Sequence, residues 1–81
     1  MEEINEYQRK FILKIFNLDH TGSGKLILKE KFQTDYYPED HDFVDYTFRF
    51  LEDVGFIKTP KGSHSFFLTQ EGFRYCKQYF I

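Results

Sequence analysis

The stretch from Tyr37 to Ile57, YPEDHDFVDYTFRFLEDVGFI, contains one helix with clear signals at both ends. Pro38 stands where a first-turn proline is tolerated, and Gly55 follows the last apolar turn. Acidic residues directly after the proline place negative charge at the positive end of the helix dipole. We therefore expect a helix from Asp40 to Val54, followed by the start of a strand.

This helix has one apolar face and one acidic face. Val44, Phe48 and Leu51 recur at a spacing of three to four residues, which predicts a buried stripe. The stripe is widened by Phe43, Thr47, Phe50 and Val54. The opposite face carries Asp42, Asp45, Tyr46, Arg49, Glu52 and Asp53. We expect about half of the helix circumference to be buried, with an acidic surface facing outward.

Length and composition set the class of protein. The 81 residues suffice for one small domain, so we expect residues 1–81 to form a single unit. Aromatic residues make up 21% of the chain, which is so much for a small core that some rings are expected on the surface. No apolar run approaches the roughly 18 residues of a membrane-spanning helix, and the acidic start lacks the positive segment of a secretory signal. These features predict a soluble, cytoplasmic protein with no membrane partner.

Cys76 has no second cysteine to pair with, and we expect it to be reduced and half-buried.

The formal net charge of −2 conceals an uneven distribution. Residues 32–53 hold one Lys or Arg against seven Asp or Glu, whereas residues 54–81 hold four against one. The middle of the chain is therefore acidic and its end is basic, which determines the faces that an anionic partner can approach.

Residues 4–18 predict a first amphipathic helix. One face carries Ile4, Tyr7, Phe11, Ile15 and Leu18, with Ile12 and Phe16 beside them. Asn5 and Gln8 have the spacing of a capping box, although the two glutamates before them are an alternative first turn. The turn-rich residues 19–24 end this helix, because either of their glycines can take the left-handed conformation.

The same turn opens the segment DHTGSGKLILKE, residues 19–30, which resembles an EF-hand calcium loop. Its candidate ligands are the side chains of Asp19, Thr21, Ser23 and Glu30 and the backbone carbonyl of Lys25. Only Asp19 and Glu30 bring negative charge, and EF-hands normally work in pairs. An ordinary helix-to-strand turn is the favoured interpretation, and weak calcium binding is the alternative.

Two short elements connect this turn to the long helix. Residues 25–28 are an apolar run that predicts a short strand, and Phe32 and Tyr36 stand at helical spacing. Pro38 holds the residue before it away from helical angles, so the two helices are separated by a few residues. Two helices joined by a short turn form a helix-turn-helix arrangement.

After Gly55 the apolar pattern changes period. Residues 56–69 place strand-forming residues on both sides of a Pro-Lys-Gly turn, which predicts a β-hairpin. Thr69 is expected to cap a last helix, and Gly72 in its first turn predicts a close approach of the backbone to the hairpin. The apolar side of this helix is predicted to carry Phe73, Cys76, Tyr79 and Phe80.

The segment LEDVGFI, the basic hairpin and the segment FFLTQEGFRYCK together resemble a pattern of winged helix-turn-helix domains. The pattern is L-E-x-x-G-hydrophobic-I, a wing and L-T-x-x-G, as in domains of the PadR and MarR type and their small bacterial and phage relatives. The resemblance covers nearly the whole chain and implies an α+β fold with a three-helix core, a short strand, a two-stranded wing and a C-terminal helix. Homodimerisation through the last helix stays open, because the long extra helices that join larger relatives are missing.

The resemblance implies a transcription-regulator-like module that binds double-stranded DNA. The acidic helix would enter the major groove, and the wing would contact phosphate. The candidate contacts are Lys25, Lys29, Lys31, Tyr46, Arg49, Lys58, Lys61 and His64. The acidic face of that helix conflicts with this function, because attraction between phosphate and Lys or Arg normally supplies much of the affinity.

A protein-interaction module on the same scaffold is the alternative function. Tyrosine is a favoured anchor in protein interfaces. The candidate contacts are Tyr36, Tyr37, Tyr46, Tyr75 and Tyr79. We expect neither an enzyme nor a cofactor, since the three histidines are dispersed and no Ser or Cys stands in a nucleophile context.

Overall fold

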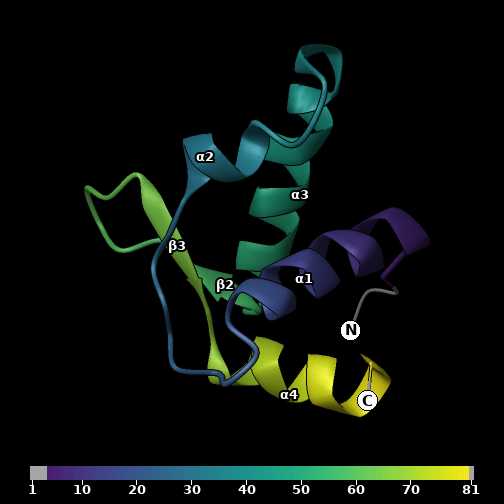
Figure 1. Cartoon of the computed structure of the whole chain (residues 1–81), viewed down its shortest axis with the longest axis vertical. Coiled ribbons are helices and arrows are strands. Elements are labelled where there is room, and N and C mark those ends of the chain that lie inside the picture. The colour runs from purple at the N-terminus through teal and green to yellow at the C-terminus, as the bar shows by residue number, and fades with distance from the viewer. Residues whose placement is uncertain (1–3, 81) are drawn as a thin grey trace.

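The computed structural model describes residues 4–80, except for the side chain of Phe80. In chain order its elements are α1 (Glu6–Leu18), β1 (Ile27–Leu28), α2 (Lys29–Gln33), the 3-10 helix η1 (Pro38–Asp40), α3 (His41–Asp53), β2 (Ile57–Lys58), β3 (Ser65–Leu68) and α4 (Gln70–Phe80). Helices α1 and α4 pack against each other, and the strands lie to one side of α3 (Figure 1). The chain therefore has a small α+β fold. Among the described residues, no helix is both long and apolar enough to cross a membrane.

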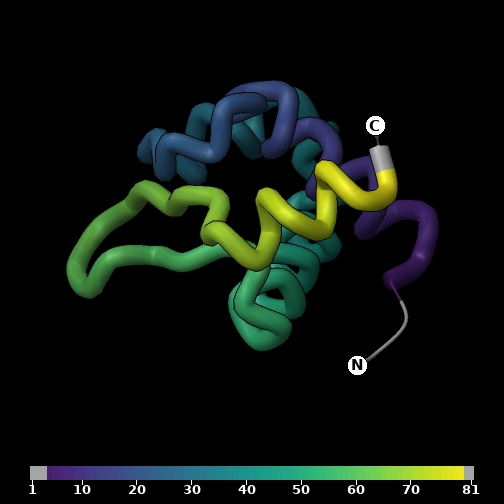
Figure 2. The backbone as a smooth tube through the Cα atoms, turned by 90° about the horizontal axis from the view of Figure 1, so that it is seen from below, coloured from purple at the N-terminus to yellow at the C-terminus, as the bar shows by residue number. Residues whose placement is uncertain are grey.

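The three strands form one antiparallel sheet in the order β1-β3-β2. Strands β2 and β3 make the predicted hairpin, with Ile57 opposite Leu68. On its other side β3 pairs with β1, and Ile27 stands opposite Phe66. The predicted strand over residues 25–28 is confirmed for its last two residues only. Figure 2 shows the hairpin loop projecting to one side of the helices.

The first helix begins at the predicted capping box. The backbone N–H of Gln8 donates to Asn5 Oδ1 at 2.8 Å, and the backbone N–H of Asn5 donates to Gln8 Oε1 at 3.1 Å. Two N–H groups that the helix leaves without internal partners are thereby satisfied. The following turn uses both of its glycines, since Gly22 and Gly24 have φ values of +69° and +79°.

Polar contacts fix the turn between α2 and α3. His41 Nε2 lies 3.1 Å from the carbonyl oxygen of Gln33 and 3.3 Å from that of Tyr36. The side chain of Gln33 also donates to Asp45 at 2.6 Å. The proline turn forms the separate helix η1, so α3 runs over His41–Asp53 rather than from Asp40 to Val54 as predicted.

The core is an aromatic cluster drawn from four elements. Phe11 of α1, Phe32 of α2, Phe48 of α3 and Phe66 of β3 are each at most 3% exposed. Ring centroids in this cluster are 5.0 Å apart for Phe11 and Phe32 and 5.0 Å apart for Phe48 and Phe66. Such pairs add to the free energy gained by burying the rings. The apolar stripe of α3 therefore faces the interior as predicted.

Burial differs from the prediction for five side chains. Four of them were predicted on apolar faces but are exposed: Phe43 by 64%, Leu18 by 43%, Tyr79 by 51% and Tyr7 by 41%. Each lies within three residues of a helix end, where the neighbouring elements cover the apolar face only in part. Cys76 lies near the middle of α4 and is fully buried rather than half-buried. The prediction for the side chain of Phe80 falls outside the described residues.

The last helix is attached to the hairpin through its first turn. Thr69 Oγ1 accepts a hydrogen bond from the Gly72 N–H at 3.1 Å and donates to the carbonyl oxygen of Gly55 at 2.6 Å. Gly55 itself has a φ of +84°, the conformation expected of a glycine that ends a helix. The predicted capping role of Thr69 is confirmed.

Candidate functional site

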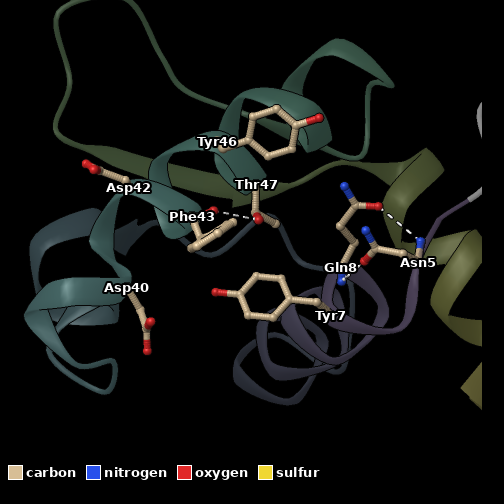
Figure 3. A pocket seen from close by; sticks show the side chains of 8 residues that line it. All are labelled: Asn5, Tyr7, Gln8, Asp40, Asp42, Phe43, Tyr46 and Thr47. Atoms are coloured by element: carbon tan, nitrogen blue, oxygen red, sulfur yellow. Dashed lines mark hydrogen bonds between the residues drawn. The ribbon is translucent and has the colours of Figure 1, made fainter.

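A groove of about 670 Å³ lies between the start of α1 and the first half of α3. Figure 3 shows the eight side chains that line it. They are Asn5, Tyr7, Gln8, Asp40, Asp42, Phe43, Tyr46 and Thr47. They come from the cap and first turn of α1, from η1 and from the first half of α3.

Three exposed aromatic rings form the rim of the groove. Phe43 is 64% exposed, Tyr46 is 62% exposed and Tyr7 is 41% exposed. Phe43 and Tyr46 stand three residues apart and therefore project from the same side of α3. The rings of Tyr7 and Phe43 lie 6.5 Å apart between centroids, inclined at 59° (Figure 3). Exposed apolar patches of this kind are common at the interaction sites of proteins, so the rim is a candidate for one.

The polar groups at the base of the groove are occupied by local hydrogen bonds. Gln8 is 5% exposed, and its side chain is held by the backbone of Asn5 in the capping box. Thr47 is 1% exposed and donates from Oγ1 to the Phe43 carbonyl oxygen at 2.7 Å. Gln8 Oε1 and Thr47 Oγ1 are thus engaged within the chain, and the Gln8 amide nitrogen is the donor that its side chain still has to offer.

The charge in the groove is negative. Asp40 and Asp42 are the charged residues in its lining, and neither forms an ion pair with any residue in the range 4–80. Burial raises the pKa of the Tyr7 hydroxyl, and the negative charge of Asp40 raises it further. The groove therefore combines an apolar surface with unpaired carboxylates.

The residues predicted to contact nucleic acid are distributed over several elements. Lys25 precedes β1 and Lys58 lies on β2, and these strands are the opposite edges of the sheet. Lys29 forms an ion pair with Glu52 at 3.6 Å and lies over the Phe48 ring at 5.4 Å. The remaining candidates are exposed, and within the described chain they form no ion pair: Lys31, Arg49, Lys61 and His64.

One contact joins the β2–β3 hairpin to the start of α2. The backbone N–H of Lys29, at the start of α2, donates to the carbonyl oxygen of His64 at 3.0 Å. These two residues also line a shallow pocket of about 370 Å³ with Glu30, Gln33 and Ser63. The β2–β3 hairpin therefore lies beside α2.

The predicted calcium loop is closed by its own aspartate. Asp19 accepts hydrogen bonds from Ser23 N and Oγ at 3.1 and 2.8 Å, from Gly24 N at 2.9 Å and from Lys25 N at 3.2 Å. Burial opposes ionisation of this carboxyl, but the hydrogen bonds outweigh burial and lower its pKa. Glu30 lies on α2 and Thr21 is exposed, and over residues 4–80 no group of three or more His, Cys, Asp or Glu could hold a metal ion.

The tyrosine candidates are placed in different environments. Tyr46 lies in the groove, and Tyr37 is 72% exposed just before Pro38. Tyr36 stacks on Phe11 at 5.8 Å, Tyr75 packs on Phe56 at 4.8 Å, and Tyr79 packs on Tyr75 at 4.6 Å. Tyr36 and Tyr75 are therefore mainly packing residues.

Sequence reasoning missed Tyr7, Phe43 and Asp40 as members of a site. Tyr7 and Phe43 were assigned to buried faces, and Asp40 was treated only as a charge at a helix start. The available signal was the position of both rings in the first turn of a helix. An apolar stripe is least covered at such an end.

Comparisons of this chain with models of protein families, with curated proteins and with solved structures found no match. A proposal about function therefore has to rest on the groove and on the charged surfaces of this chain.

Proposed function

We propose that the chain is a winged-helix module that binds a protein partner through the groove between α1 and α3. The winged-helix assignment is supported by the element order, with β2 and β3 as the wing, and by the motifs LEDVGFI and FFLTQEGF. In this arrangement α3 occupies the position of the recognition helix. Its outward face would bind protein instead of a DNA groove.

The exposed ring of Phe43 carries this proposal. A phenylalanine that is 64% exposed next to Tyr46 and Tyr7 leaves a contiguous aromatic surface in water. Burying one such ring against a partner contributes roughly 1.5–3 kcal/mol. Aromatic residues surrounded by polar groups are typical of the residues that dominate protein interfaces.

The charge of α3 supports a protein partner over DNA at this face. The helix presents Asp42 and Asp45 beside Phe43 and Tyr46, and Arg49 is its single cation. Phosphates would be repelled by these carboxylates, whereas a protein can offer cations and apolar side chains together.

Photo-crosslinking tests this function directly. A benzophenone side chain replaces Phe43 in one variant and Tyr37 in a control variant, and both full-length chains are expressed in the cells from which the protein comes. Tyr37 is equally exposed but lies outside the groove lining. We expect one protein adduct from position 43 and none at the same mass from position 37. Equal adducts from both positions, or none from position 43, would contradict the proposal.

Binding of duplex DNA by the wing is a second candidate function. It is favoured by the position of Lys61 and His64 in the hairpin, which projects to one side of the helices (Figure 2) and contacts the start of α2 through the His64 carbonyl oxygen. Lys58 and Lys61 are exposed and form no ion pair within residues 4–80. Such lysines can contact phosphate without entering a groove.

A further inference from the structure

The groove between α1 and α3 has its charge at one end and its rings in the middle. In Figure 3, Asp40 and Asp42 lie on one side of the Tyr7 and Phe43 rings, and Asn5 and Gln8 lie on the other. The Tyr7 hydroxyl points toward the side that carries Asp40. A ligand that fits must therefore place a cation at one end and apolar groups along the middle.

The guanidinium group of arginine has the properties that this end of the groove requires. It is planar, donates two parallel hydrogen bonds to a carboxylate, and stacks on aromatic rings. A lysine ammonium can satisfy the charge but not the stacking. Asp40 and Asp42 supply carboxylates without a partner in the described chain, and Phe43 supplies an exposed ring next to them.

We propose that the groove holds an arginine-bearing amphipathic segment of the partner protein. Its arginine pairs with Asp40 or Asp42, and its apolar side chains cover Phe43, Tyr46 and Tyr7. This assignment rests on the proposed function, and it specifies the chemistry of the partner.

The charge of the lining excludes several other occupants. A nucleic acid or an acidic peptide would bring negative charge to two carboxylates that form no ion pair within residues 4–80. A purely apolar segment would leave Asp40 without a cation while partly removing it from water, which is unfavourable. Charge complementarity therefore selects a cationic segment.

Synthetic peptides provide the test, with the whole chain as the receptor. The probe is a short amphipathic peptide of leucine and arginine with blocked ends. Matched peptides carry lysine or glutamate in place of arginine. Binding is followed by amide chemical shifts in two-dimensional NMR at low and at moderate salt.

We expect saturable shifts at Tyr7, Phe43 and Tyr46 with the arginine peptide, weaker shifts with lysine and none with glutamate. The double substitution Asp40→Asn and Asp42→Asn should weaken binding of the arginine peptide on the order of threefold to tenfold, since each exposed pair contributes modestly. Asp53→Asn, on the same helix but outside the groove lining, is the control and should leave the affinity unchanged.

Three results would overturn the inference: equal binding of the arginine and glutamate peptides, shifts confined to another face, or no binding of any peptide. The crosslinking experiment separates this failure from that of the proposed function. If the adduct still forms at position 43 while the arginine peptide fails, the groove binds protein of a different chemistry. If both fail, the groove is not the binding site.

Discussion

The Cα of Gly72 packs against the carbonyl group of Phe56, and a Cβ at position 72 would overlap that carbonyl oxygen. A Cβ there would also lie 2.8 Å from Leu68 Cδ1. The absence of a side chain at Gly72 thus allows α4 to sit directly on the hairpin, as its place in the sequence predicted.

We predict that Gly72→Ala destabilises the protein by about 1–3 kcal/mol, because the methyl group collides with fixed backbone. Helix propensity alone would make the alanine variant more stable than the parent by roughly 1 kcal/mol. A loss of stability therefore shows that the steric overlap outweighs helix propensity. Urea unfolding followed by circular dichroism measures the difference. Gln78→Ala, at an exposed site on α4, is the control and should stay within about 0.5 kcal/mol of the parent. A Gly72→Ala chain that is more stable than the parent would show that the contact is absent.

Alkaline pH should destabilise the fold through Cys76. Burial raises the pKa of its thiol from 9.0 to about 12. Between these values the unfolded chain has lost the proton while the folded chain keeps it, so stability is complete below pH 9 and falls as pH rises toward 12. Burial raises the pKa of the Tyr36 hydroxyl to about 12, and Tyr7 and Asp35 contribute to this rise. Tyr36 therefore also lowers the stability of the fold as pH rises above 10.

The Cys76→Ala variant isolates the thiol contribution. Its stability is measured by urea unfolding at a series of pH values. It should begin to fall about one pH unit later than in the parent, when the Tyr36 and Tyr7 hydroxyls begin to titrate in the unfolded chain. Because the Cys76 side chain is fully buried, a thiol reagent should modify it in the native protein no faster than the protein unfolds. Rapid labelling of the native chain at neutral pH would contradict this expectation.

The turn after α1 should depend on the charge of Asp19. Asp19→Asn removes the carboxylate that organises three backbone N–H groups, and we expect a loss of about 1–3 kcal/mol. Because the pKa of Asp19 is lowered, its contribution is present above pH 3.8 and is lost as pH falls through the depressed value. The loss should therefore be seen at neutral pH and should vanish in strong acid. Asp53→Asn, at an exposed site, is the matched control.

Calcium should leave this turn unchanged, since both Asp19 oxygens already accept hydrogen bonds from the loop. The amide shifts of Gly22 and Gly24 report on any rearrangement during a titration with millimolar Ca²⁺. Saturable shifts at both glycines would restore the calcium interpretation.

Duplex binding by the wing predicts weak and strongly salt-dependent affinity. The logarithm of the affinity should fall as the logarithm of the salt concentration rises. If Lys58 and Lys61 each neutralise a phosphate, replacing both with glutamine should make this negative slope shallower by about two. Lys10→Gln, on an exposed site of α1, should leave the slope unchanged. No binding to random duplex DNA at low salt would remove this candidate function.

Features set by neighbouring residues could be predicted from the sequence. The capping box at Asn5 and the stop at Gly55 follow from local backbone chemistry, and the burial of Phe48 follows from helical periodicity. The close approach at Gly72 was also predicted, because a glycine in a first turn suggests contact with another backbone.

Features set by distant residues could not be predicted in this way. Periodicity placed Phe43 on the apolar stripe, but its burial depends on how far α1 extends along α3, where the Tyr7 ring lies beside it and leaves it 64% exposed. The separation of Lys25 from Lys58 depends on the strand order, which places β3 between them. A sequence pattern does not contain either relationship.

The most direct test of the proposed function is the affinity of the full chain for the protein crosslinked at position 43. Isothermal titration compares the parent with Phe43→Ser and with the control Tyr37→Ser, each first shown to be folded by circular dichroism. We predict that Phe43→Ser weakens binding about tenfold or more, as truncation of an interface anchor does, and that Tyr37→Ser leaves it unchanged. Equal affinities for the parent and Phe43→Ser would contradict a binding site at the α1–α3 groove.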